Sequence, residues 1–386
     1  MSTQLIAQDL DLRAATAAEV AAAHADEVDV AARFPEEAMA ALAEAGLLGA
    51  SVPVELGGEG LSLAELAGVA AQLGAACSST GMIFAMHHSQ VLSLTRHLGG
   101  SPALAALATR IVREQLLLAS ATTEIGIGGD VRSSTCFVDR DGDRVHLVKN
   151  APVISYGEQA DLVLATARRD GDAAPGDQVL VACDSDALTL EPSGTWDTLG
   201  LRGTNSRGFL LTADTAAERV VPTPYEEISA ETMLPVSHVL WAGVWLGMSR
   251  AAVETARRYV RSAARKSIGT TPPGATALVK LVAQLESLEL LVTSAAREFD
   301  ERADDRAALG QVGFMVSMNN LKVTASEAVA EIVAGALRIT GISGFRNDGQ
   351  YSVARLFRDA QGAALMVHND RITAHTAQLI LVQKGI

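Results

Sequence analysis

Apolar residues recur three and four positions apart along most of the first 120 residues, a spacing that predicts amphipathic helices. The clearest runs are residues 20–30, 36–48 and 63–73, which are rich in alanine, the best helix former. Gly57-Gly58 interrupts the pattern and marks a loop, whereas Ser101-Pro102 supplies the cap residue and first-turn proline of a helix start. We therefore expect residues 1–120 to form an N-terminal helical domain.

The pattern changes between residues 121 and 229. Short runs rich in β-branched residues occupy positions 144–148, 162–167, 179–183 and 208–212. Turn residues separate them at positions 141–143, 170–172 and 175–177. Short strands divided by turns in this way predict a small middle domain of antiparallel β structure.

Helical spacing returns beyond residue 230. The segments 237–264, 275–302 and 308–337 are long and carry apolar stripes wide enough to pack together as a bundle. The last of them is followed by the glycine turn of Gly341 and Gly344 and by a second short helix expected at 351–359. The chain is thus expected to be an α+β protein with domains at residues 1–120, 121–229 and 230–386.

Composition narrows the possible functions. The chain has 386 residues and a formal net charge of −14 without a basic run, which argues against a nucleic-acid partner. Its cysteines, Cys77, Cys136 and Cys183, are too few and too scattered for a metal cluster or a disulfide framework, and suit a reducing cytoplasm. The first residues lack the basic start and long apolar run of a signal peptide, and no stretch reaches the roughly 18 apolar residues of a membrane span. We expect a cytoplasmic protein with no membrane partner.

Several loose motifs follow one another in a definite order. They are ALAEAGLL at 41–48, TEIGIGGD at 123–130, LGLRGTNSRG at 199–208, RKSIG at 265–269 and RLFRDA at 355–360. Over nearly the whole chain this order resembles the acyl-CoA dehydrogenase family of flavoenzymes, whose corresponding runs include TEPGAGSD and LGxRxSxTxG. The resemblance implies helical, β and helical domains in turn, with four helices in the C-terminal bundle. It also implies an FAD-dependent oxidoreductase that assembles as a homotetramer or dimer.

The resemblance implies that FAD lies between the β domain and the C-terminal helices. Thr123 and Glu124 would pass the isoalloxazine ring, with their backbone groups and the threonine hydroxyl bonding its polar edge. Val153 and Ser155 match the family's Trp-x-Thr pair beside the flavin. With Val153 in the place of tryptophan that face of the ring should be less covered, while the Ser155 hydroxyl would reach N5.

A second group of residues would bind the FAD of a neighbouring subunit. Arg265 would contact its pyrophosphate as a fixed cation, and Gly341 and Gly344 would let backbone N–H groups approach the same phosphate. Ile268 and Asn369 are further cofactor-binding candidates by their places in the family pattern. The structural alternatives are that Arg265 is a solvated cation at a helix end and that the glycines only end a helix.

In the family a carboxylate removes the α-proton of an acyl thioester while a hydride passes to flavin N5. Counting seven residues from Ala360 places that glutamate at Val367, followed by His368 and Asn369. In a second subgroup the glutamate lies on the first C-terminal helix, at the position of Ser237. Neither position holds a carboxylate, so a conventional dehydrogenation lacks its base.

Three interpretations of this loss remain open. His368 could be a substitute base, because imidazole titrates near neutral pH. Alternatively the flavin performs oxygenation with reduced flavin and O₂, as in relatives with a C-terminal histidine near the ring. The third interpretation is a flavin-binding homologue without catalysis. The structural alternative for His368 is a loop histidine satisfied by its own neighbours.

By the same resemblance His87 lies on the helix that lines the acyl pocket, where it would favour a short or polar acyl group. Gly129 replaces a serine that often touches the thioester arm in the family, and Ser237 would line the same pocket. His87 and His88 lack the i, i+4 spacing of a helical metal site, so no metal is expected. The leading expectation is an acyl-CoA dehydrogenase-type enzyme with an altered base, acting on a CoA or carrier-protein thioester. An electron-transfer or flavin-reductase protein would be its redox partner.

Overall fold

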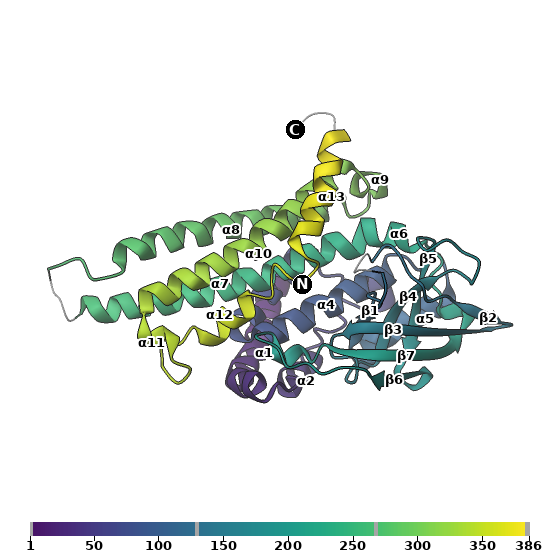
Figure 1. Cartoon of the computed structure of the whole chain (residues 1–386), viewed down its shortest axis with the longest axis horizontal. Helices are drawn as coiled ribbons and strands as arrows, with labels where there is room; N and C mark the ends of the chain where they lie inside the picture. Colours follow the sequence, from purple (N-terminus) through teal and green to yellow (C-terminus); the bar gives the residue numbers. More distant parts are fainter. Residues whose placement is uncertain (1–2, 128–130, 266–268, 383–386) are drawn as a thin grey trace.

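The computed structural model describes residues 3–127, 131–265 and 269–382. Within this part of the chain, helices extend to residue 114, strands lie between residues 118 and 216, and helices return from residue 225 onward. Figure 1 shows the strands gathered on one side of the molecule, with the long C-terminal helices extending away from them. The predicted order of helical, β and helical regions is confirmed.

The N-terminal part consists of α1 (Thr3–Ala31), α2 (Glu36–Glu44), α3 (Leu63–Ala76), α4 (Ser78–Thr95) and α5 (Pro102–Glu114). Helix α2 ends earlier than predicted because Gly46, with φ of 72°, closes a Schellman turn in which the Leu47 N–H donates to the Leu42 carbonyl oxygen at 2.9 Å. Helix α3 begins at a capping box formed by Ser62 and Glu65. Helix α4 is buried along nearly its whole length, so it occupies the interior of the molecule.

The strands form two sheets. The first has the order β1 (Leu118–Ala121), β4 (Leu162–Arg168), β5 (Gln178–Asp184), and the second β2 (Asp139–Asp141), β3 (Arg144–Ile154), β7 (Arg207–Ala216), β6 (Leu188–Pro192). The second sheet is antiparallel, as predicted. In the first sheet β1 runs parallel to β4. The sequence pattern does not predict this pair, because β1 lies at the end of the stretch expected to be helical.

Three long helices dominate the C-terminal part: α7 (Leu234–Ala264), α8 (Ala275–Arg302) and α10 (Val312–Thr340). They lie side by side in Figure 1, and α13 (Asn369–Val382) packs against α10 near the end that meets the sheets. The shorter elements are α6 (Tyr225–Ile228), the π-helical turn Ser229–Met233, α9 (Arg306–Leu309), α11 (Ile342–Phe345) and α12 (Ala354–Ala360). Single 3₁₀ turns occur at Val54–Leu56, Ser185–Ala187, Arg202–Thr204 and Ala217–Arg219.

Glycines let α3 and α7 approach each other closely. A Cβ atom at Gly247 would lie 2.0 Å from the Ala71 carbonyl oxygen, and one at Gly74 would lie 2.5 Å from the Val244 carbonyl oxygen. Through this contact the N-terminal and C-terminal helices share an apolar core, which also includes residues of the sheets such as Phe209. None of the described helices is long and apolar enough to cross a membrane.

Candidate functional site

Thr123 lies just beyond β1 and beside the end of β3. Its hydroxyl donates to the Val153 carbonyl oxygen at 3.2 Å, and the Ile125 N–H donates to the Asn150 carbonyl oxygen at 2.9 Å. Two apolar side chains of these paired segments are open to solvent, Ile125 with 55% of its surface exposed and Val153 with 39%. Exposed apolar groups beside hydroxyl and backbone polar groups form a surface that suits a planar heteroaromatic ring.

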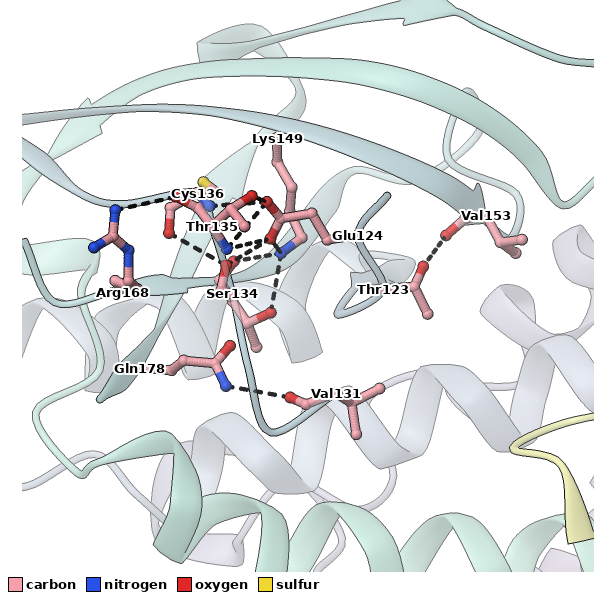
Figure 2. A network of polar contacts seen from close by, with 11 residues as sticks. Thr123, Glu124, Val131, Ser134, Thr135, Cys136, Lys149, Val153, Arg168 and Gln178 are labelled. Carbon is pink, nitrogen blue, oxygen red and sulfur yellow. Dashed lines mark hydrogen bonds and ion pairs between the residues drawn. The ribbon is translucent and has the colours of Figure 1, made fainter. Parts of the chain in front are cut away.

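Glu124 points the other way, into the β domain (Figure 2). Its carboxylate accepts hydrogen bonds from three successive residues, namely from the Ser134 hydroxyl at 2.6 Å, from Thr135, and from the Cys136 N–H at 2.8 Å. The Lys149 ammonium lies 3.2 Å from the same carboxylate. The backbone of Glu124 thus stays beside Thr123, while its side chain holds the backbone at Thr135 and Cys136.

The ion pair of Glu124 and Lys149 is buried, with 3% and 0% of the side chains exposed. Burial acts to raise the pKa of Glu124, but the hydrogen bonds from its hydroxyl partners and the Lys149 charge outweigh burial and hold the pKa below its ordinary value. Burial lowers the pKa of Lys149, against the attraction of Glu124. The Glu124 carboxylate is therefore a structural group and is not open to a substrate.

Ser155 begins a chain of hydroxyl groups immediately after β3. Its Oγ lies 2.8 Å from the Ser206 Oγ, which lies 2.7 Å from the Thr204 Oγ1. Thr204 and Ser206 are buried and Ser155 is only partly so, which leaves the Ser155 hydroxyl at the accessible end. The same loop is tied to α12, because the Leu201 N–H donates to the Asp359 carboxylate at 2.6 Å.

Residues 364–369, which we call the C-terminal turn, lead into α13, whose first residue is Asn369. Val367 has φ of 43°, a left-handed conformation that is rare for a β-branched residue. Its carbonyl oxygen accepts a hydrogen bond from the Lys322 Nζ of α10 at 3.0 Å, and Lys322 also donates to the Asn369 side-chain oxygen at 2.6 Å. Among the described residues, the N–H groups of Val367 and His368 have no backbone acceptor.

Asn369 and His368 lie in opposite environments. Asn369 is buried, and its amide group donates to the Ser326 hydroxyl at 3.0 Å besides accepting from Lys322. The His368 side chain is 50% exposed, and its Nδ1 accepts from the Asp370 N–H at 3.3 Å. The structure thus gives Asn369 internal partners in place of the predicted cofactor contact, and leaves His368 at the surface of the C-terminal turn.

Ser237 and His238 face different helices from the start of α7. Ser237 donates to the Ser89 hydroxyl of α4 at 3.1 Å, and His238 Nδ1 lies 3.1 Å from the Met318 carbonyl oxygen of α10. Burial, together with the Lys322 charge, lowers the pKa of His238 to about 4, so the ring is neutral. His238 therefore carries no charge near neutral pH, and the Ser237 hydroxyl is engaged with Ser89.

His87 has a structural role in place of the predicted one in an acyl pocket. The ring is fully buried, with Nε2 2.7 Å from the Leu48 carbonyl oxygen and Nδ1 accepting from the Leu118 N–H at 3.0 Å. Burial lowers its pKa to about 4, so the ring stays neutral with its proton on Nε2. His88 is buried and held through both nitrogens in the same manner. The two histidines join α4 to the backbone around it.

Arg265 lies at the opposite end of the bundle from Ser237. It follows the last residue of α7, about 40 Å away along a helix that rises about 1.5 Å per residue. Figure 1 shows this end of α7, together with α11, far from the sheets. A single chain therefore does not bring Arg265 to Thr123 and Ser155.

The local structure explains why residues 341 and 344, near the Arg265 end of the bundle, are glycines. Gly341 ends α10 with φ of 57° and ψ of −137°, a conformation that glycine alone adopts readily, and a Cβ atom at Gly344 would lie 1.9 Å from the Thr340 Oγ1. Both N–H groups already donate to carbonyl oxygens, at 2.8 Å and 3.0 Å. The predicted use of these two N–H groups for phosphate is thus corrected. In the described turn, the N–H groups without a backbone acceptor belong to Ile342 and Ser343.

The structure brings Thr123, Val153 and Ser155 together at the end of β3, and the Leu201–Asp359 hydrogen bond joins this group to the C-terminal helices. Gly129 and Ile268 lie outside the described residues. Sequence reasoning missed Lys322, whose only signal is a lysine within the apolar stripe of α10. It also missed the internal partners of the predicted residues, namely Ser134, Lys149, Ser206 and Ser326.

Two family models match the chain: "Acyl-CoA dehydrogenase, N-terminal domain" over residues 10–128 and "Acyl-CoA dehydrogenase, C-terminal domain" over residues 228–367. Together they cover more than half of the sequence. With the observed order of helices and sheets, they define an enzyme of the acyl-CoA dehydrogenase fold. The chain belongs to the acyl-CoA dehydrogenase family, a family of flavoenzymes.

The names of relatives within the family state different activities. Cyclohex-1-ene-1-carbonyl-CoA dehydrogenase of Syntrophus aciditrophicus is 26% identical over 358 residues, 91% of this chain and 84% of that protein. L-evernosamine nitrososynthase of a Micromonospora species is 28% identical over 380 residues, 92% of this chain and 85% of that protein. FMN-bound TdsC from Paenibacillus sp. A11-2, a dibenzothiophene monooxygenase, superposes with a TM-score of 0.85 at 21% identity, covering 98% of both chains.

Proposed function

We propose that this protein is a flavin-dependent monooxygenase that uses reduced flavin and O₂. The observation that carries the proposal is that residue 367, where the resemblance to the family implies the proton acceptor, is a valine in the C-terminal turn. Val367 has no titratable group, and Ser237 at the alternative place is hydrogen-bonded to Ser89. Oxygen transfer needs no base to remove an α-proton, so this site suits oxygenation better than dehydrogenation.

The described residues fit a flavin. Exposed Val153 and Ile125 offer apolar contact, the Thr123 hydroxyl and nearby backbone groups offer polar contact, and Ser155 offers a hydroxyl at the accessible end of its chain. When bound, reduced flavin supplies two electrons to O₂, so that one oxygen atom passes to the substrate and the other leaves as water. The protein's own part is to hold the substrate beside the flavin and to exclude bulk water.

For FAD rather than FMN, a second copy of the chain would complete the site. Arg265 lies about 40 Å along α7 from Ser237, at the end of the bundle far from the sheets, so its proposed partner is the pyrophosphate of a neighbouring subunit's cofactor. FMN has no pyrophosphate. Replacing Arg265 by alanine should therefore weaken the binding of FAD, measured by equilibrium dialysis, and leave the binding of FMN unchanged. Equal loss of both flavins, or of neither, would remove Arg265 from this role.

His368 is the proposed catalytic residue. It lies on the exposed side of the C-terminal turn, next to Val367, and an imidazole group can act as a general acid or base. His368→Ala should lower oxygen transfer by about tenfold or more without loss of flavin. The control is His24→Ala, which alters a partly exposed histidine on α1. Equal turnover in the two variants would show that His368 takes no part in oxygen transfer.

Relatives support both oxygenation and a second candidate function. Nitrososynthases that act on amino sugars are named for forming a nitroso group, a reaction that places oxygen on nitrogen. The second candidate is dehydrogenation of a short or polar acyl thioester with His368 as substitute base. Its support is the Val367 N–H, which has no backbone acceptor among the described residues and could polarise a thioester carbonyl. The redox partner would be a flavin reductase in the first case and an electron-transfer protein in the second.

Anaerobic titration separates the two functions. The flavin-loaded protein is mixed with butyryl-CoA or cyclohex-1-ene-1-carbonyl-CoA without oxygen, and the visible absorbance of the flavin is followed. If the protein is an oxygenase, the flavin of the wild type should keep its absorbance. In Val367→Glu, where a carboxylate is restored, part of the flavin absorbance should be lost. Val367→Gln is the matched control, because its amide cannot accept the proton. Bleaching by the wild type would favour dehydrogenation.

A further inference from the structure

Lys322 is a fully buried lysine of α10 without a carboxylate in hydrogen-bonding distance among the described residues. Its ammonium donates to two neutral oxygens, the Val367 carbonyl at 3.0 Å and the Asn369 side-chain oxygen at 2.6 Å, both in the C-terminal turn. The Nζ atom also lies 6.0 Å from the centre of the Trp245 ring. A buried charge is costly unless its partners are well placed, so this arrangement strongly favours one conformation of the turn.

The conformation that it favours is an unusual one. Val367 is β-branched and has φ of 43°, so it stays in the left-handed region only where the surroundings hold it there. The hydrogen bonds that hold it act on Val367 itself and on the residues that follow it. Lys322 binds its carbonyl oxygen, and Asn369, two residues later, is bound by Lys322 and Ser326 together.

We propose that Lys322 is a positioning residue: it holds Val367 in the left-handed conformation and thereby sets where the Val367 N–H and the His368 ring lie. Its cation also polarises the peptide unit that joins Val367 to His368, because the bound oxygen and the His368 N–H belong to the same unit. The link to catalysis rests on the proposed function, whereas the hold on the turn is a property of the described structure.

The charge of Lys322 depends on pH. Burial lowers its pKa to about 8, and the charge of Glu327 on the same helix acts in the opposite direction. The other groups that face it are the neutral His238 and the Trp245 ring of α7, and Asn369 of the turn. Above this pH the neutral amine keeps two N–H donors, so its hydrogen bonds weaken and do not break.

The first test is hydrogen–deuterium exchange of the flavin-loaded protein, read on peptides that cover residues 362–372. Lys322→Met should speed exchange in the C-terminal turn about tenfold or more and leave the segment 118–125 unchanged. Lys280→Met, which alters an exposed lysine of α8, is the control and should change neither segment. Unchanged exchange of the turn in Lys322→Met would overturn the proposal.

The second test uses tryptophan fluorescence between about pH 6 and 10, because Trp245 senses the nearby charge. The wild type should show a transition near pH 8 that is absent in Lys322→Met and in Trp245→Phe. Asn369→Asp would give Lys322 a carboxylate partner and should move the transition upward by about one pH unit or more. This variant keeps the proposal testable even if Lys322→Met does not fold, because an unmoved transition would contradict it.

The proposal has two parts, the hold of Lys322 on the C-terminal turn and the effect of that hold on catalysis, and each part can fail without the other. Faster exchange of the turn in Lys322→Met with lower oxygen transfer supports both parts. Faster exchange with unchanged oxygen transfer would support the hold on the turn and would remove the turn, and His368 with it, from the reaction, while the proposed oxygenation itself would stand.

Discussion

At the scale of single residues, buried polar side chains organise this site more than exposed ones do. Glu124, Lys322 and His87 are each buried, and each makes at least two hydrogen bonds to other segments of the chain. The residues open to solvent, such as Val153 and His368, are positioned by the elements that these buried groups hold.

The Glu124–Lys149 pair should therefore be important for stability. Glu124→Gln would leave the Lys149 ammonium buried without its counter-ion, which costs about 3–5 kcal/mol in comparable cases. The free energy of unfolding from urea denaturation measures this loss. Asp214→Asn breaks the exposed pair with Arg144 and should cost about 1 kcal/mol or less. Similar losses of unfolding free energy in the two variants would show that the buried pair stabilises the protein no more than the exposed pair does.

The sequence predicts which residue types stand at the site, but not their partners. The motif around Thr123 and Val153 is visible in the sequence, and the two residues do meet. The partners of Glu124 are 10 to 25 residues away, and those of Lys322 are 45 and 47 residues away, so no local pattern reveals them. The partners of His87 are hidden for the same reason, since Leu48 and Leu118 bind its nitrogens from distant segments.

At the scale of elements, the close approach of α3 and α7 fixes how the N-terminal helices sit on the bundle. A methyl group at Gly247 would lie 2.0 Å from the Ala71 carbonyl oxygen, and backbone cannot move aside without separating the helices. Gly247→Ala should therefore destabilise the protein by about 1–3 kcal/mol or more, measured by urea denaturation.

Gly68→Ala is the matched control on α3. This glycine is exposed, and a Cβ atom there would meet nothing within 4 Å. Because alanine is the better helix former, this variant should be stabilised by about 0.5–1 kcal/mol. A destabilised Gly68→Ala, or a neutral Gly247→Ala, would contradict the packing described here.

The helices were more predictable than the strands, because a long apolar stripe repeats its signal several times. The segment 275–302 coincides with α8, and α7 and α10 lie within a few residues of their predicted ranges. Strand β1 has four residues, and its parallel partner β4 lies more than 40 residues later, so the pattern at 118–121 carries too little information. The mid-chain strands were predicted because turn residues separate them.

At the scale of the whole molecule, buried neutral histidines link stability to pH. Burial lowers the pKa of His87, His97 and His238 to about 4, and that of His88 well below its ordinary value. In the unfolded chain these rings take up protons below about pH 6.5, so between about pH 6.5 and 4 the unfolded state binds more protons and becomes favoured.

The free energy of unfolding should therefore fall as the pH is lowered through this window, by up to about 1.4 kcal/mol per pH unit for each histidine that titrates only in the unfolded state. Urea denaturation at several pH values between about 7 and 4.5 measures the slope. A constant free energy of unfolding across this range would show that these rings are protonated in the folded protein as easily as outside it.

The central claim is that the site handles oxygen with reduced flavin, and the reaction of the reduced, flavin-loaded protein with O₂ tests it most directly. Stopped-flow absorbance follows the return of oxidised flavin after mixing, without need of a known substrate. We predict two phases, with a species between them whose spectrum differs from both reduced and oxidised flavin. A single phase leading directly from reduced to oxidised flavin would contradict the proposed oxygenation.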